Sequence, residues 1–268
     1  MLKMQFFFIF RIFYIFDAEN RHPNMRKKVV FIVLLLGMVS TSTGQNQQLQ
    51  IMSYNVRHCA GMDLVVDYDR TYAVIVQQQP DVVALQELDS MTGRSEHRDQ
   101  LDELASRTGY HQVFGAAIEF DGGQYGVGIL SREMPVSTKR IPLPGEESRV
   151  LLVVELEDYV IACTHLDLDE AQRLASVPLI VEEAQRWQKP FLLAGDWNDT
   201  PDSELLKAMT QYFTILSGEE ATYPADEPTE CIDYVGVFNG RAEAIDSHVI
   251  DEPEASDHRP LAVRVQLR

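Results

Sequence analysis

The stretch "EASDHRPLAVRVQL", residues 254–267, joins a cluster of charged side chains to the pattern of a buried strand. From Leu261 to Leu267 every second residue is Leu or Val, which is typical of a strand with one face in the core. Pro260 stands directly before this strand, where its missing N–H costs little. The preceding run Asp257-His258-Arg259 serves either solubility or chemistry, and the rest of the sequence decides between the two.

Seven further segments have the apolar, β-branched composition of buried strands. They are "LQIMSYN" (49–55), "PDVVALQE" (80–87), "YGVGILSR" (125–132), "RVLLVVELE" (149–157), "YVIACTH" (159–165), "PFLLAGDWN" (190–198) and "ECIDYVGVF" (230–238). Helical spacing of apolar residues predicts helices between some of them, over 69–79, 99–108, 169–187 and 201–209. Gly109 is a C-cap signal for the second helix, and Pro178 should kink or interrupt the third. Mixed strands and helices with no internal repeat or long linker predict one α/β layered domain over residues 45–268.

Polar side chains stand at the ends of several predicted strands. They are Asn55, Glu87, His165, Asp196 with Asn198, Asp233 inside the run 230–238, and Asp257-His258 before the last strand. Polar groups at strand ends in α/β sheets commonly collect at one edge, where ligands bind. The sequence therefore predicts a single site at such an edge.

Carboxylates and an amide dominate this set, which favours a hard cation such as Mg²⁺. The backbone of Glu87 is expected to be buried while its carboxylate reaches the edge; the alternative is a solvated glutamate at the start of a loop. Asp196 and Asn198 are two residues apart, so in an extended segment their side chains point the same way. The run "GDWN" (195–198) can also form a turn with a side-chain cap.

Two histidines, His165 and His258, are candidates for proton transfer near neutral pH, although a single histidine is often structural. A buried carboxylate that accepts the Nδ1–H of such a ring would orient it and support its cation. Asp233, within the apolar run "CIDYVGV", is the candidate carboxylate. The alternative is a buried aspartate that bonds only to backbone amides.

Taken in order, the segments "SYN", "QE", "THL", "GDWN", "ID" and "SDHRP" resemble the endonuclease/exonuclease/phosphatase superfamily over nearly all of residues 45–268. The resemblance implies a four-layered α/β sandwich, in which two packed mixed β-sheets are flanked by helices. It also implies cleavage of a phosphate ester with Mg²⁺ or Mn²⁺. Carried over by motif, Glu87 is the principal metal ligand, Asn55 lies at the metal and Asp257 completes the metal edge. Tyr125 is not assigned, because it is displaced by one position from a tyrosine of the abasic-site enzymes.

The same resemblance implies the roles of the remaining candidates. Asp196 would align the attacking water, while Asn198 and His165 would stabilise the phosphorus centre. His258, oriented by Asp233, would act as the acid/base.

The N-terminal residues are expected to be removed before the protein acts. Residues 25–44 have a basic start, an apolar run from Val29 to Val39 and then small residues, which is typical of a signal peptide. The run is too short to span about 30 Å of hydrocarbon, so we expect export to the periplasm or the medium rather than a membrane anchor. We also expect translation to start at Met25, which leaves residues 1–44 as N-terminal extension and signal peptide.

The exported part is strongly acidic. Six of the 23 Lys+Arg and two of the 41 Asp+Glu lie in residues 1–44, so residues 45–268 carry 17 basic and 39 acidic side chains, a formal net charge of −22. Such a surface opposes nucleic-acid binding, which depends on neutralising phosphates, and adhesion to anionic lipid. We expect a monomer, in which Cys59, Cys163 and Cys231 allow at most one internal disulfide.

The sequence therefore predicts an exported, metal-dependent phosphodiesterase or phosphomonoesterase that acts on a small phosphorylated molecule or a lipid headgroup. The alternatives are a secreted endonuclease or exonuclease acting on DNA or RNA, and a non-catalytic binding module on the same scaffold. Arg94 and Arg98, in "TGRSEHRDQ" (92–100), are candidate contacts for a substrate phosphate, unless they are solvated loop charges.

Overall fold

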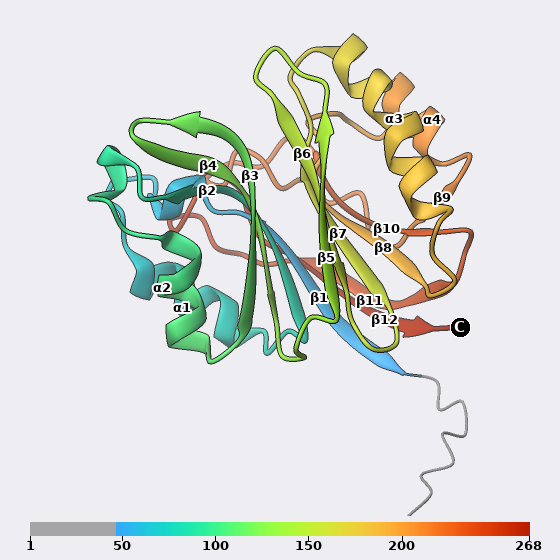
Figure 1. Cartoon of the computed structure of the whole chain (residues 1–268), viewed down its shortest axis with the longest axis horizontal. Helices are drawn as coiled ribbons and strands as arrows, with labels where there is room; N and C mark the ends of the chain where they lie inside the picture. Colours follow the sequence, from blue (N-terminus) through green and yellow to red (C-terminus); the bar gives the residue numbers. More distant parts are fainter. Residues whose placement is uncertain (1–46) are drawn as a thin grey trace, which may run out of the picture. The chain divides into compact units, whose positions relative to one another are not determined.

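Twelve strands form two six-stranded sheets in the computed structural model, which describes residues 47–268 (Figure 1). The first sheet holds β1 (Gln48–Asn55), β2 (Val82–Ser90), β3 (His111–Phe120), β4 (Gly123–Ser131), β11 (Ala242–Val249) and β12 (Leu261–Leu267). The second holds β5 (Ser137–Leu143), β6 (Arg149–Glu155), β7 (Val160–His165), β8 (Phe191–Asp196), β9 (Phe213–Ile215) and β10 (Asp233–Phe238). Their strand orders are β11-β12-β1-β2-β4-β3 and β5-β6-β7-β8-β10-β9.

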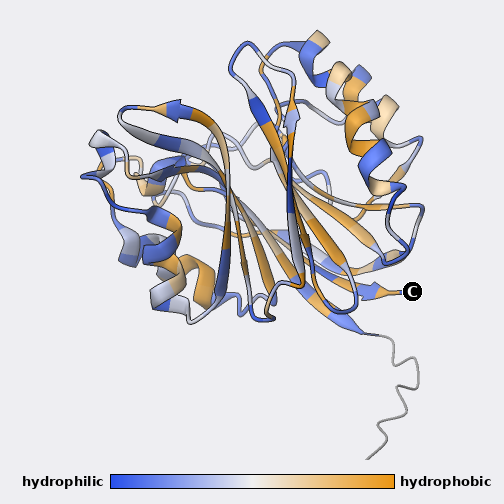
Figure 2. Ribbon diagram, in the orientation of Figure 1, coloured by the Kyte–Doolittle hydropathy of each residue, from blue (hydrophilic) through white to orange (hydrophobic). Residues whose placement is uncertain are grey.

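Helices cover the outer face of each sheet. Helices α1 (Tyr68–Gln77) and α2 (Gln100–Thr108) pack on the first sheet, and α3 (Glu170–Ala184) and α4 (Glu204–Met209) pack on the second. Between the sheets, buried aliphatic side chains of both form the central core, and Figure 2 shows the same concentration of hydrophobic residues on the strands. The predicted four-layered α/β sandwich is confirmed.

All eight predicted strands are present, but four strands were missed: β3, β5, β9 and β11. Each of the four is an edge strand of its sheet. Edge strands are partly exposed to water, and β5 and β11 carry several charged residues, so their apolar pattern is weak, while β9 is only 3 residues long.

The four predicted helices are also present, with two differences at prolines. Helix α3 runs without interruption through Pro178, because this residue is exposed and water can bond the carbonyl group that it leaves free. Helix α4 begins at Glu204 rather than at Pro201, since the Ser203 side chain accepts a hydrogen bond from the Leu206 amide at 3.2 Å and caps the helix there.

Each sheet contains one central pair of parallel strands, β1 with β2 and β7 with β8. Such strands are joined by a crossover helix, here α1 and α3, and their carboxyl ends lie at the same edge of the sheet. At the end of β8 the strands approach so closely that a Cβ atom on Gly195 would lie 2.0 Å from the Thr164 carbonyl oxygen. Only glycine fits there, directly before Asp196.

The predicted signal peptide (25–44) and the start at Met25 lie outside the described residues. Within residues 47–268, no helix is long and apolar enough to cross a membrane. Cys59, Cys163 and Cys231 are buried and free, so none of them forms a disulfide.

Candidate active site

Three buried polar residues form a row across the second sheet. His165 on β7 lies opposite Asp196 on β8, and Asp196 lies opposite Asp233 on β10. Residues directly opposite each other point to the same side of a sheet, here the side that faces the first sheet. The strand register alone therefore brings an imidazole and two carboxylates together.

The first sheet contributes Asn55 and Glu87. Asn55 ends β1, but Glu87 does not end its strand as the sequence suggested, because β2 continues to Ser90. Glu87 lies instead in a β-bulge, where the register shifts between Leu85 and Leu88 and the φ angle of Glu87 is 59°. In a regular strand Glu87 would share the outer face with Leu85, under helices α1 and α2. The bulge turns it toward Asn55.

The Asn55 side chain links the two sheets. Its Nδ2 donates to Glu87 Oε1 at 3.0 Å and to Asp196 Oδ2 at 3.1 Å. The Ser256 hydroxyl donates to the Asn55 carbonyl oxygen at 2.7 Å and ties the segment that carries Asp257 and His258 to the end of β1.

His258 and Asp233 form a buried pair. The Nδ1 atom of His258 lies 2.9 Å from Asp233 Oδ2, which also accepts a 2.6 Å hydrogen bond from the Thr222 hydroxyl. The His258 Nε2 atom lies 3.7 Å from Asp196 Oδ2. Burial disfavours the His258 cation, but the charges of Asp233 and Asp196 outweigh burial and raise the pKa of His258 to about 10. His258 is therefore an imidazolium at neutral pH.

The pKa values of Asp196 and His165 shift in opposite directions. Burial and then the charge of Asp233 raise the pKa of Asp196. Burial lowers the pKa of His165 to about 4, so this ring is neutral at pH 7 even though Asp196 favours its cation. Neighbouring groups thus have pKa values shifted by their environment, which is common in sites built for proton transfer.

Arg149 is a site residue that the sequence analysis missed. Its Nη1 lies 3.4 Å from His165 Nδ1, and because an arginine can only donate, the proton of His165 must sit on Nε2, facing Asp196. Arg149 is buried and starts β6, which is antiparallel to β7. The start of an antiparallel strand lies at the same edge as the end of its neighbour, and this was the available signal.

One predicted residue, Asn198, lies differently from expectation. Asn198 does not share the direction of Asp196, because β8 ends at Asp196 and the chain turns, with φ of 52° at Asn198. The Asn198 amide nitrogen bonds to Asp196 Oδ1 at 2.9 Å, and Nδ2 bonds to the Leu166 carbonyl oxygen at 2.8 Å. Asp257 forms an ion pair with Arg57 at 3.3 Å.

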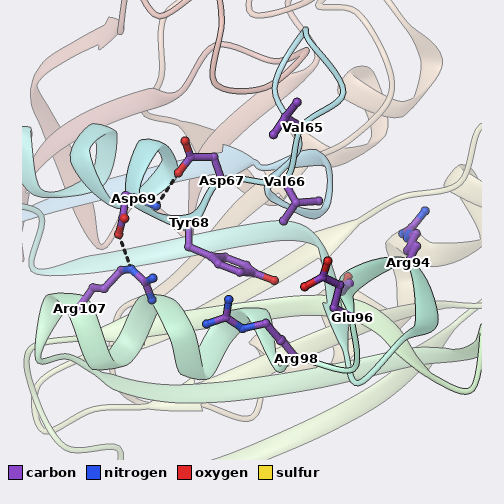
Figure 3. Close-up of a pocket in the computed structure, with 10 residues that line it drawn as sticks. Val65, Val66, Asp67, Tyr68, Asp69, Arg94, Glu96, Arg98 and Arg107 are labelled. Atoms are coloured by element: carbon purple, nitrogen blue, oxygen red, sulfur yellow. Dashed lines mark hydrogen bonds and ion pairs between the residues drawn. The ribbon is translucent and has the colours of Figure 1, made fainter.

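Of the two candidate phosphate contacts, only Arg94 lies near Glu87. Arg94 lines a small pocket together with Glu87, while its side chain pairs with Asp89. Arg98 pairs with Glu103 and lies over the Tyr68 ring, with its guanidinium carbon 4.8 Å from the ring centroid. Both arginines line a second pocket of about 450 Å³ beside α1 and α2, which does not include Glu87 (Figure 3).

Two sets of side chains could hold a metal ion. Ligand atoms of Asp196, Asp233 and His258 lie within 4.8 Å of one another. In that set, however, Asp233 Oδ2 already bonds to His258 Nδ1 and to the Thr222 hydroxyl, and a metal ion would compete with these bonds. Glu87, with Asn55 beside it, offers the hard oxygen donors that Mg²⁺ and Mn²⁺ prefer, and fits such an ion better.

The comparisons with known proteins agree with the family that the motifs indicate. Residues 52–258 match the sequence profile of the Endonuclease/Exonuclease/phosphatase family. A comparison with curated proteins found no match.

Several solved structures are similar to the domain. An endonuclease/exonuclease/phosphatase from Beutenbergia cavernae is 24% identical with a TM-score of 0.71, over 83% of this chain and 72% of that chain. A mannosyl-6-phosphatase from Bacteroides thetaiotaomicron is 18% identical with a TM-score of 0.67, over 81% and 99% of the two chains. Sphingomyelinase C from Streptomyces griseocarneus is 18% identical with a TM-score of 0.62, over 83% and 100%.

If Asp233 orients and charges His258, their substitutions should be strongly non-additive. We expect His258→Ala to lower the rate of substrate turnover by about 10²–10⁴, the range for a lost general acid or base. Asp233→Asn should lose a substantial part of that, because an amide can hold the ring but cannot stabilise its cation. The double variant should then be little slower than His258→Ala. Rates and melting temperatures of the three variants measure this cycle; fully additive rate losses, with stability lost at Asp233, would make Asp233 a structural residue only.

Proposed function

Because the chain belongs to the endonuclease/exonuclease/phosphatase family, whose members hydrolyse phosphoester bonds, we propose that it is an exported, divalent-metal-dependent phosphoesterase. Its substrate in this proposal is a small phosphorylated molecule or a lipid headgroup. The observation that carries the proposal is the continuous set of contacts from Glu87 through Asn55 and Asp196 to the His258–Asp233 pair. It joins hard metal ligands to a charged acid and a carboxylate base.

The raised pKa values of Asp196 and His258 support one role for each group in moving the two protons of the reaction. Asp196, whose pKa is raised, aligns the attacking water and takes a proton from it as oxygen bonds to phosphorus. As the bond from phosphorus to the leaving oxygen breaks, the imidazolium of His258 gives that oxygen a proton through Nε2. Asp233 keeps the ring in place through Nδ1 and stabilises its charge.

Neutral side chains contact the phosphoryl group in this proposal. His165 directs its Nε2–H toward the side of Asp196, whose Oδ2 lies 3.5 Å away, and this N–H would donate to a phosphoryl oxygen bound beside the ring. Asn198, held by its bond to the Leu166 carbonyl oxygen, is the second donor or acceptor at the phosphorus centre.

Glu87, Asn55 and Asp257 would hold the divalent cation, Mg²⁺ or Mn²⁺. When bound, the cation supplies positive charge that polarises the phosphoryl group and offsets charge in the transition state. Arg57 pairs with Asp257 at 3.3 Å, so this arginine would share the carboxylate with the cation.

The substrate class is supported by charge. The net charge of −22 on residues 45–268 disfavours a long polyanion, and favours a substrate with one or few phosphates. Two structural neighbours are named a mannosyl-6-phosphatase and a sphingomyelinase C, and these names also fit a small phosphate ester and a lipid headgroup. Export is proposed from the sequence of residues 25–44 alone.

Glu87→Gln tests the metal site. The substitution keeps the shape of the side chain but removes the charge, so Mg²⁺ affinity and activity should fall together by at least tenfold, while the melting temperature changes little. Titration calorimetry with Mg²⁺ measures the affinity, and Glu146→Gln, an exposed carboxylate in another loop, is the matched control. Undiminished Mg²⁺ affinity in Glu87→Gln would place the metal elsewhere.

Ionic strength separates the proposed function from a nuclease. A screen with Mg²⁺ over phosphomonoesters, phosphodiesters, sphingomyelin and DNA should show fast cleavage of a small ester. Cleavage of DNA should be slow at low salt and should improve as salt screens the repulsion. Rapid DNA cleavage at low salt that declines as salt is added would support the nuclease instead.

A further inference from the structure

A small pocket with a volume of about 130 Å³ is lined by Glu87 but not by Asp196. Its other lining residues come from the loop after β2, the β3–β4 hairpin and the loop before β6: Arg94, Ile118, Phe120, Tyr125 and Glu147. This volume has room for a few water molecules only, and so it suits one small ring rather than a long group. Its contact with Glu87 places such a ring next to the phosphoryl group of the proposed reaction.

Arg94 is fixed in this pocket by its own partners. Its Nε and Nη2 donate to the two carboxylate oxygens of Asp89 at 2.6 and 2.8 Å, and the Asp89 side chain is completely buried. The guanidinium carbon also lies 4.5 Å from the centroid of the Phe120 ring and 5.6 Å from that of Tyr125. Within residues 47–268, Nη1 of Arg94 has no hydrogen-bond partner, so it is a rigid donor that a ligand can use.

Two charged side chains of the pocket, Arg94 and Glu147, already have partners of opposite charge within the protein. Asp89 neutralises Arg94 with two parallel bonds, which makes this arginine a poor site for a phosphate dianion but a good donor to a neutral group. Glu147 pairs with Arg149 at 3.2 Å, and its side chain is 44% exposed, so its second oxygen can accept a hydrogen bond from a ligand. The pocket therefore offers a ligand carboxylates that accept hydrogen bonds, and an arginine and the Tyr125 hydroxyl that donate them. Phe120 and Ile118 supply apolar surface.

We infer that this pocket binds a neutral, hydroxylated ring, a sugar or a cyclic polyol, that carries the phosphate to be cleaved; the inference rests on the proposed function. Hydroxyl groups both donate and accept, and so match the mixed lining, while the C–H face of such a ring packs on Phe120 and Ile118. A quaternary ammonium headgroup fits poorly, because the guanidinium of Arg94 already covers the Phe120 ring on which such a cation would pack. Arg94 thus contacts a hydroxyl of the substrate, not its phosphate.

The experiment compares three ligands on the full exported chain with Mg²⁺: glucose 6-phosphate, myo-inositol 1-phosphate and phosphocholine. Each is assayed as the monoester and as the p-nitrophenyl diester, with p-nitrophenyl phosphate as a reference that has no polyol. We expect kcat/KM for a polyol ester to exceed that for the choline ester at least tenfold. Glu147→Gln and Arg94→Lys should each lower this ratio by about tenfold or more, the loss expected for one hydrogen bond to a charged group. Glu146→Gln, next to Glu147 but outside the pocket, should leave the ratio unchanged.

The outcomes separate the two proposals. Cleavage of the choline ester as fast as the polyol esters, or an unchanged ratio in Glu147→Gln, would overturn the pocket assignment and leave the phosphoesterase intact. Cleavage of no phosphate ester would overturn the proposed function. Calorimetric binding of glucose 6-phosphate to the metal-free chain then still tests the pocket: binding that Glu147→Gln weakens supports it, and no binding refutes it.

Discussion

The side-chain amide of Asn55 holds the polar edge of the domain together, because its Nδ2 reaches a carboxylate from each sheet, Glu87 and Asp196. The packed core between the sheets could not by itself bring these groups into contact. Two local features of the backbone make the contact possible. The bulge in β2 turns Glu87 inward, and Gly195 lets β8 approach β7 closely enough to place Asp196 beside His165. Neither feature improves the hydrophobic core, and both serve the position of a carboxylate.

The same edge gathers charges that are costly to bury. Asp196, Asp233 and His258 are each at most 5% exposed, and one oxygen of Asp233 is buried without a hydrogen-bond partner. Buried ionised groups contribute little to stability unless they are paired, and replacing them with apolar residues is often neutral or stabilising. Here the imidazolium of His258 faces two carboxylates, which raise its pKa despite burial, while burial and the charge of Asp233 raise the pKa of Asp196. The arrangement is therefore better explained by chemistry than by folding.

Much of this could be predicted from the sequence, for a simple reason. Strands in the middle of a sheet are buried on both faces and show plainly as apolar runs, so the polar residues that close them stand out; Asn55, His165 and Asp196 were found in this way. Edge strands are partly exposed, and all four were missed.

The direction of a side chain depends on single φ angles, so the bulge at Glu87 and the turn at Asn198 could not be predicted from alternation. Arg149 was missed because it starts its strand, whereas the other site residues were sought where strands end. The starts of antiparallel strands reach the same edge of the sheet. Arg98 stood near Arg94 in sequence, but its loop carries it to Glu103 and away from Glu87.

The central claim is that the metal ion and the acid/base pair occupy different parts of one site, with Glu87 on the metal side and the His258–Asp233 pair intact. A crystal soaked in Mn²⁺, with the metal located by its anomalous scattering, tests this most directly. The account predicts an anomalous peak bonded to a Glu87 oxygen, with the His258 Nδ1 to Asp233 hydrogen bond preserved. A peak bonded to Asp196, Asp233 and His258, with none at Glu87, would contradict it.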